Sequence, residues 1–143
     1  MQDAEAGRRS LLALRELGFS VAIDDFGTGH CSLNYLKRFP LDALKIAPAL
    51  IADLTDDTGD AAIVRAVIAL ARKLNLRITA AGVATPAQLQ SLRAENCHLI
   101  QGSLLGPAVR AQKFARLLEG ADTANTATVR ALQLAIAPVA VSA

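Results

Sequence analysis

Short apolar runs alternate with segments of helical periodicity along most of this chain, and this alternation limits the folds that it can adopt. We expect strands over residues 19–23, 43–46, 77–81 and 98–101. We expect helices over residues 4–17, 33–37, 60–74, 85–95 and 111–118. Parallel strands need a long crossover connection, usually a helix, so four strand-then-helix units predict an α/β fold with a parallel sheet. Periodicity does not distinguish a doubly wound sheet from half of an eight-stranded barrel.

Local signals mark where several of these elements begin and end. Gly18 is expected to end the first helix, because glycine adopts positive φ without strain. Asp60 is expected to be the N-cap of the helix that follows it. Thr85 and Gln88, on either side of Pro86, have the spacing of a capping box, which predicts the start of another helix.

Composition supports a packed domain and excludes several functions. Of the 143 residues, 52% are hydrophobic, so wholesale disorder is excluded. The net charge is +2 and no basic cluster occurs, so we expect no DNA partner. The longest apolar run near the carboxyl end is shorter than the ~20 residues that span a bilayer, and with no secretory signal we expect a cytoplasmic protein. We expect residues 1–120 to form the domain and the Ala/Thr-rich residues 121–143 to be an appended tail.

Polar side chains stand at the ends of three of the four expected strands. Asp24 and Asp25 follow the first, Lys45 ends the second and Gln101 ends the fourth. Reactive groups of parallel α/β folds gather at these carboxyl ends. Adjacent carboxylates are oxygen ligands of the kind that divalent cations prefer, and a lysine beside them can hold a phosphate or a nucleophilic water. These residues are therefore candidates for a metal-assisted phosphoryl site.

Each candidate also has a structural interpretation. An Asp pair before glycine commonly forms a turn with side chain to backbone hydrogen bonds. Lys45 and Gln101, each taken alone, are typical of strand-end surface residues. His30 and His98 have no partner at metal-ligand spacing, and Cys31 and Cys97 are expected to be reduced, partly buried thiols.

Four motifs, in order, resemble those of the EAL domain family. The run Ile-Asp-Asp-Phe-Gly-Thr-Gly at residues 23–29, followed by Ser32-Leu33 and Tyr35-Leu36, resembles its most characteristic motif. Residues 44–46 resemble its Leu-Lys-Ile-Asp segment, residues 80–85 its Ala-Glu-Gly-Val-Glu-Thr segment, and Gln101-Gly102 with Pro107 its Gln-Gly and Pro pattern. Together the motifs cover about residues 11–118.

The resemblance implies a partial TIM-type (β/α) barrel with about four parallel β/α units, the C-terminal half of an EAL domain. The family hydrolyses cyclic di-GMP to a linear dinucleotide with Mg²⁺ or Mn²⁺. By position, Asp24 and Asp25 match metal-ligand aspartates, Lys45 the lysine near the attacking water, and Gln101 an active-site glutamine. The loop over residues 27–33 matches the segment that couples the metal site to dimerisation.

The sequence departs from the family at positions that carry the chemistry. Ala47 stands where the family has Asp, and Ala81 and Ala84 stand where it has Glu. We find no segment resembling the family's first half, which supplies further metal ligands. Alanine offers no oxygen to a metal, and loss of ligands or of transition-state charge costs orders of magnitude in rate. We therefore expect weak or absent metal binding and no catalysis by this chain alone.

Three functions follow from these observations. The first is an inactive interaction or regulatory module of cyclic-di-GMP signalling. The second is a phosphodiesterase completed by a missing N-terminal half or a partner chain, and the third is a non-catalytic cyclic-di-GMP sensor. Four strands leave two open sheet edges, and we expect the apolar side chains of Val21, Ile23, Leu44, Ile46 and Ile78 on the inner face to be open to water. Self-association, or pairing with another chain, is therefore expected.

Overall fold

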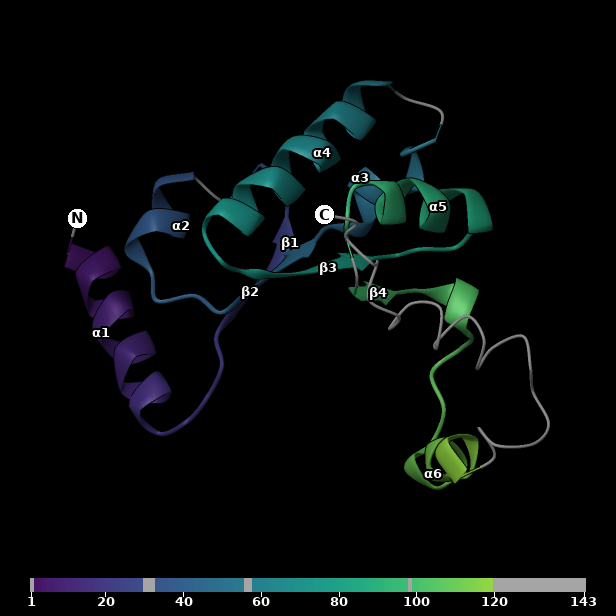
Figure 1. Ribbon diagram of the computed structural model, residues 1–143. Coiled ribbons are helices and arrows are strands. Elements are labelled where there is room, and N and C mark those ends of the chain that lie inside the picture. Colours follow the sequence, from purple (N-terminus) through teal and green to yellow (C-terminus); the bar gives the residue numbers. More distant parts are fainter. Residues whose placement is uncertain (1, 30–32, 56–57, 98, 120–143) are drawn as a thin grey trace, which may run out of the picture.

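The fold is a single parallel sheet covered by helices. A computed structural model describes residues 2–29, 33–55, 58–97 and 99–119. Its strands, β1 (Ala22–Phe26), β2 (Ala43–Ile46), β3 (Arg77–Ala81) and β4 (Leu99–Gln101), form one sheet in the order β1-β2-β3-β4 (Figure 1). All neighbouring pairs are parallel. This confirms the predicted parallel α/β architecture.

Helices precede the first strand and follow each strand. They are α1 (Gln2–Glu16), α2 (Leu33–Arg38), α3 (Pro48–Ala52), α4 (Thr58–Lys73), α5 (Pro86–Ala94) and α6 (Ala111–Glu119), with a 3₁₀ turn η1 (Ser103–Leu105). The α3 helix and the 3₁₀ turn were not predicted, because elements of five and three residues are too short to show a period. Pro48 occupies the first turn of α3, where its missing N–H costs no hydrogen bond.

The strand order is that of a barrel and not that of a doubly wound sheet. A doubly wound sheet reverses its strand order at a switch point, whereas here each strand lies beside the next one in sequence. The connecting helices α2, α4 and α5 lie on the same side of the sheet (Figure 1). This is the arrangement of half of a TIM-type (β/α) barrel.

The core lies between the sheet and its helices. Leu44 and Ile46 of β2 are fully buried in one cluster with Val64 and Ile68 of α4, and Ile78 of β3 belongs to the same cluster. The prediction that these strand residues would be open to water is therefore wrong for all three, and Ile23 of β1 is also partly buried against this cluster. Their side chains point toward the helices, because alternate residues of a strand face opposite sides of the sheet.

The first strand begins and ends later than predicted. We expected residues 19–23, but Phe19 is exposed and β1 runs from Ala22 to Phe26. The cause is pairing with β2, which continues to Phe26 through an irregularity between Ile23 and Phe26. Asp24 and Asp25 thus lie within the strand and not after it.

Helix ends follow most of the sequence signals. Gly18 has a φ of 88°, and the N–H groups of Gly18 and Phe19 donate to the carbonyls of Arg15 and Leu14, which ends α1 as expected. The capping box at Thr85 is present. The predicted cap at Asp60 is wrong, because α4 already begins at Thr58. Asp60 lies in the first turn, where its charge suits the helix dipole.

The first and last helices extend away from the core. Asp42 ties α1 to the sheet, since its carboxylate accepts from Val21 N at 2.7 Å and pairs with Arg15 at 3.1 Å. The α6 helix lies beyond β4, at the opposite end of the sheet (Figure 1). Within the described residues, no helix is long and apolar enough to cross a membrane. The predicted tail over 121–143, His30, Cys31 and His98 lie outside the described residues.

Candidate functional site

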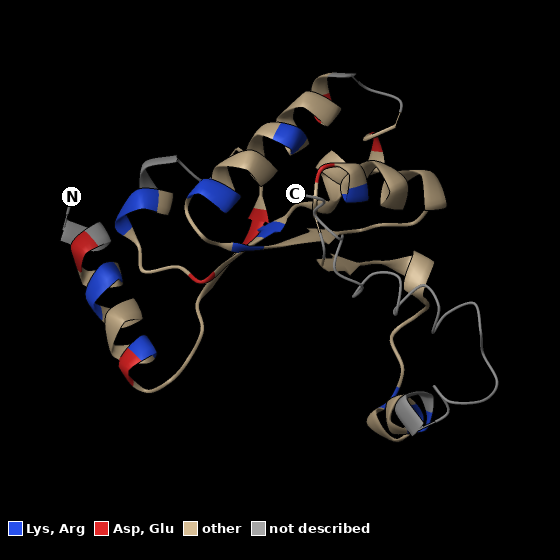
Figure 2. Ribbon diagram, viewed as in Figure 1, with Lys and Arg blue, Asp and Glu red and all other residues tan. Residues whose placement is uncertain are grey.

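Lys45 and Asp24 form the centre of the candidate site. The Lys45 Nζ donates to Asp24 Oδ2 at 2.7 Å. This bond joins β2 to β1 on the face of the sheet opposite the helices. Figure 2 shows a red acidic segment of β1 beside a blue basic segment of β2. The hydrogen bond from Lys45, then the N–H of Asp25, hold the pKa of the Asp24 carboxyl below its ordinary value of 3.8. Lys45 is therefore not a free surface lysine.

Asp25 adopts an unusual backbone conformation beside this pair. Its φ is 52°, in the left-handed region, and its N–H donates to Asp24 Oδ1 at 2.9 Å. Thr28 Oγ1 donates to the Asp25 carbonyl at 3.1 Å. The predicted turn with side chain to backbone bonds is thus present, together with the Lys45 ion pair. One Asp24 oxygen accepts from the backbone and the other from an ammonium group.

Gly27 lies in this turn where the turn packs against Leu50 of α3. Its φ is 109°, and a side chain there would collide with Leu50 of α3. Glycine is needed for both reasons, because positive φ strains other residues and because the space is occupied. The turn after β1 is therefore held in place by α3, an element that the sequence did not reveal.

Two of the three alanines that replace family carboxylates are buried. Ala47 is 1% exposed and Ala81 is 7% exposed, while Ala84 is exposed. After Ala81, Gly82 has a φ of 83°, and its missing Cβ makes room for Pro48. The chain at Ala81 and Gly82 is thus packed directly on the start of α3.

Gln101 lies at the far side of the sheet from Asp24. It pairs with Ala81 in the β3–β4 register, and its carbonyl accepts from Val83 N at 3.0 Å. A Cβ on the following Gly102 would collide with the Val83 backbone, so this close approach requires glycine. The structure therefore brings Asp24 and Lys45 together, but not Gln101 with either of them.

Gln88 has a structural role that the sequence indicated only in part. Its Oε1 accepts from the N–H groups of Ala84 and Thr85 at 2.8 and 3.1 Å, as the capping-box spacing predicted. Its Nε2 also donates to the carbonyls of Ile51 and Ala52 at 2.9 and 3.2 Å. This buried side chain satisfies the end of α3 and the start of α5 together. No local pattern indicates the second pair of bonds.

The side chains of the described residues do not complete a divalent-metal site. No group of three or more His, Cys, Asp and Glu side chains is close enough to hold an ion within those residues. Six or more oxygen ligands surround Ca²⁺ or Mg²⁺ in proteins, whereas here Asp24 already pairs with Lys45. Cys97 is buried, and burial raises the pKa of its thiol to about 11, which makes it a poor ligand.

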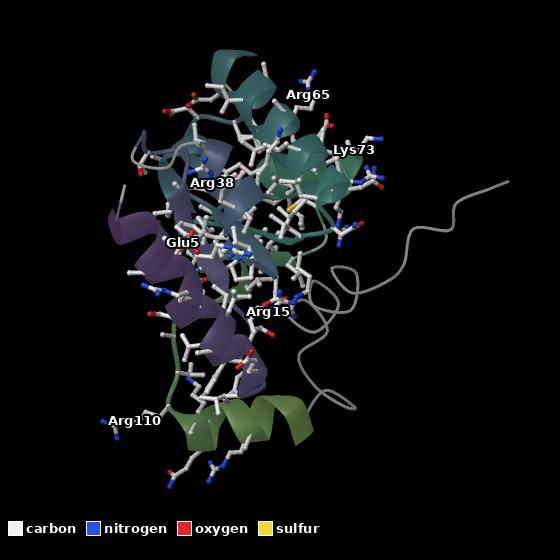
Figure 3. The ribbon with its side chains drawn as sticks, turned by 90° about the vertical axis from the view of Figure 1, so that its left-hand side faces the viewer. Glu5, Arg15, Arg38, Arg65, Lys73 and Arg110 are labelled. Carbon is white, nitrogen blue, oxygen red and sulfur yellow. The ribbon has the colours of Figure 1, made fainter. Side chains whose placement is uncertain are left out.

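Basic side chains do not gather into a nucleic-acid surface. Arg15, Arg38, Arg65, Lys73 and Arg110 are distributed from one end of the molecule to the other (Figure 3). Arg15 and Arg65 are in ion pairs with Asp42 and Glu95. DNA binding is therefore not indicated by the described surface.

A parallel half-barrel with an Asp–Lys pair on neighbouring strands places the chain in the class of (β/α)-barrel proteins. Comparison with known sequences identifies its family. Residues 1–108 match the EAL domain family, so the chain belongs to this family. It is 49% identical over 106 residues to cyclic di-GMP phosphodiesterase NbdA of Pseudomonas aeruginosa. That match covers 72% of this chain and 14% of the relative. Signaling protein YkoW of Bacillus subtilis is 36% identical over 118 residues, 82% of this chain and 15% of the relative.

Solved structures show the same fold. The chain matches the EAL domain of Mycobacterium smegmatis DcpA with a TM-score of 0.79 and 42% identity, covering 83% of this chain and 53% of that one. It matches the PaMucR phosphodiesterase in complex with c-di-GMP with a TM-score of 0.74 and 47% identity, covering 80% of this chain and 46% of that one. The chain thus spans about half the length of these solved EAL chains.

Proposed function

We propose that this chain is a non-catalytic interaction or regulatory module of cyclic-di-GMP signalling. The observation that carries the proposal is the buried alanine at position 81, together with Ala47. Both are closely packed, at positions where the motifs of the family have carboxylates. Neither a metal nor a proton can bind an alanine methyl group, so these two positions offer no oxygen ligand.

The remaining polar groups support weak metal binding at most. If Mg²⁺ or Mn²⁺ bound here, Asp24 and Asp25 would hold it, and Lys45 would be the nearest cation. The metal would supply Lewis acidity to a phosphoryl oxygen or activate a water. An ion must first compete with Lys45 for the Asp24 carboxylate, and among the described residues only Asp25 supplies a further adjacent carboxylate. Affinity in the millimolar range, roughly that of sparse sites, is expected.

A phosphodiesterase completed by another segment or chain is the second candidate. It is favoured by the retained Asp24–Lys45 pair and by the 47% identity to a structure named as a phosphodiesterase in complex with c-di-GMP. Gln101 would then complete the pocket from β4. A non-catalytic sensor that binds cyclic di-GMP would use the same pocket. The phosphodiesterase and the sensor would each need further residues, beyond the described sheet, to complete a binding pocket.

The partner of the module is a second copy or another protein chain. Among the described residues, β1 and β4 each have one edge with no neighbouring strand, which supports this proposal, since unpaired parallel edges favour pairing with another chain. We also propose that the protein acts in the cytoplasm, where cyclic di-GMP is a messenger.

Hydrolysis of cyclic di-GMP tests the proposal. The purified chain should form no linear dinucleotide above a no-enzyme control with Mg²⁺ or Mn²⁺. The triple variant Ala47→Asp, Ala81→Glu, Ala84→Glu should also be tested, to learn whether the carboxylates alone restore turnover. Metal-dependent product from the unmodified chain, abolished by Asp24→Ala, would overturn the proposal and favour the phosphodiesterase.

A further inference from the structure

The short helix α3 packs against two of the turns that follow strands of the sheet. A Cβ on Gly82 would lie 2.7 Å from Pro48, the first residue of α3, so the turn after β3 packs directly on the start of this helix. A Cβ on Gly27, in the turn after β1, would collide with Leu50, the third residue of α3. In a closely packed structure a displacement of α3 therefore changes the packing of both turns.

The local sequence of α3 does little to hold this helix in place. Its N-cap residue, Ala47, makes no side-chain cap hydrogen bond, and the helix has no acidic residue in its first turn and no basic residue in its last. Five residues form about one and a half turns, far fewer than an isolated helix needs. Leu50 and Ile51 are buried in the core, which anchors one side of the helix. The carbonyl groups at its end need partners from elsewhere in the chain.

Gln88 of α5 supplies these partners and joins them to the turn after β3. Its Nε2 donates to the carbonyls of Ile51 and Ala52 at 2.9 and 3.2 Å. Its Oε1 accepts from the N–H groups of Ala84 and Thr85 at 2.8 and 3.1 Å. The Gln88 residue is only 5% exposed. One buried amide group thus fixes the end of α3 relative to the turn after β3.

The turn after β3 is itself fixed to the segment after β4. Val83 N donates to the Gln101 carbonyl at 3.0 Å, and the Val83 carbonyl accepts from Leu104 N at 3.1 Å. Val83 is buried, and Gly102 approaches its backbone so closely that a Cβ would collide. Gln88 therefore holds α3 against a part of the molecule that has little freedom to move.

We propose that Gln88 is a positioning residue for the candidate site and acts through α3 on the turn that carries Asp24 and Asp25. Gln88 fixes the end of α3, and Leu50 of the same helix packs on Gly27, two residues after Asp25. A displacement at the start of α5 is thereby transmitted to the turn after β1, with no direct contact between Gln88 and the acidic residues. The inference goes beyond the proposed function, because it holds whether or not the chain is catalytic.

The variant Gln88→Glu separates the two halves of this side chain. At neutral pH the carboxylate still accepts from the two N–H groups before α5, but it cannot donate to the carbonyls at the end of α3. Hydrogen exchange at the amides of Leu50 and Leu54, which donate to carbonyls of residues 47 and 51, should become about tenfold faster. Gln90→Glu, at an exposed position of the same helix, is the matched control and should leave the exchange unchanged.

The backbone amide resonances of Gly27 and Gly82 report whether the two turns follow α3. Gln88→Glu should shift both resonances and Gln90→Glu neither, whereas a merely local role of Gln88 would shift Gly82 alone. Leu50→Val shortens the side chain that meets Gly27. In that background Gln88→Glu should still shift Gly82 but should move Gly27 less. A Gly27 resonance that Gln88→Glu leaves in place, or moves equally with and without Leu50→Val, would overturn the proposal.

Native-state hydrogen exchange of the unmodified chain provides a test that does not depend on the folding of a variant. At low urea concentrations the amides of Leu50 and Leu54 should open together with those of Ala84 and Thr85, because one side chain holds both segments. Separate openings with different dependence on urea would contradict the coupling. None of these measurements uses the hydrolysis assay, so an active chain would overturn the proposed function alone, and an unmoved Gly27 would overturn this inference alone.

Discussion

The Lys45 ammonium lies 2.7 Å from the Asp24 carboxylate and joins β2 to β1 at the candidate site. The pair places a resident cation on the carboxylate that the family motif assigns to a metal. We expect Lys45→Met to raise the pKa of Asp24 toward 3.8, because the hydrogen bond from Lys45 is the largest cause of its depression. Carboxyl ¹³C chemical shifts during an acid titration measure this change. An unchanged Asp24 titration would show that the ion pair does not persist in solution.

The Asp24–Lys45 ion pair also makes the stability of the fold depend on pH. A carboxyl whose pKa is lower in the folded than in the unfolded protein stabilises the fold above the unfolded pKa, and this contribution is lost as pH falls through the folded pKa. For Asp24 the loss should occur as the pH drops below about 3.8, its ordinary pKa. Urea unfolding of the parent and of Lys45→Met across this range should give curves that converge at the acidic end. Curves that stay parallel would contradict the linkage.

Magnesium binding should be weak and should become stronger when Lys45 is removed. Without the ammonium, Asp24 Oδ2 loses its charged competitor, so Lys45→Met should bind Mg²⁺ more tightly than the parent. Isothermal titration calorimetry measures this, with Lys37→Met on α2 as a control lysine outside the site. A micromolar dissociation constant in the parent, lost in Asp25→Asn, would mean that additional ligands complete the site.

Gln88→Leu should be strongly destabilising. The substitution leaves the N–H groups of Ala84 and Thr85 and the carbonyls at the end of α3 without their partner. Each buried unsatisfied group costs about 1–3 kcal/mol, but Ala52, Ala84 and Thr85 are exposed and water can replace some of these bonds, so a loss of roughly 2–4 kcal/mol is expected. Urea denaturation measures it. Gln90→Leu, at an exposed position of the same helix, should change stability by no more than about 0.5 kcal/mol. Equal losses would refute the role of Gln88.

Gly82→Ala should cost more than Gly29→Ala. Both glycines have positive φ, 83° and 90°, so both substitutions bear the cost of a left-handed alanine, about 1–2 kcal/mol. Only at Gly82 does the new methyl meet Pro48, at 2.7 Å, whereas at Gly29 no atom of the described residues lies within 4 Å. The difference in unfolding free energy between the variants therefore isolates the steric term. A zero difference would mean that α3 moves freely away from the end of β3.

The sequence by itself determined the local elements whose signals lie within a few residues. The Thr85-Pro86 start, the end of α1 at Gly18 and the polar character of the strand ends were all predictable, because each depends on one turn or one side chain. The family motifs likewise identified the half-barrel. Limits of β1 were not predictable, because pairing with β2 and not local hydropathy decides where that strand ends.

Only the tertiary structure decided which groups meet. Lys45 and Asp24 are 21 positions apart and pair because adjacent strands set their register. Gln88 and Ile51 are 37 positions apart and meet because α5 packs beside the end of α3. The burial of Leu44, Ile46 and Ile78 under α4 was also missed. An apolar strand residue can serve either face of a sheet, and the side that the crossover helices cover determines which face is dry.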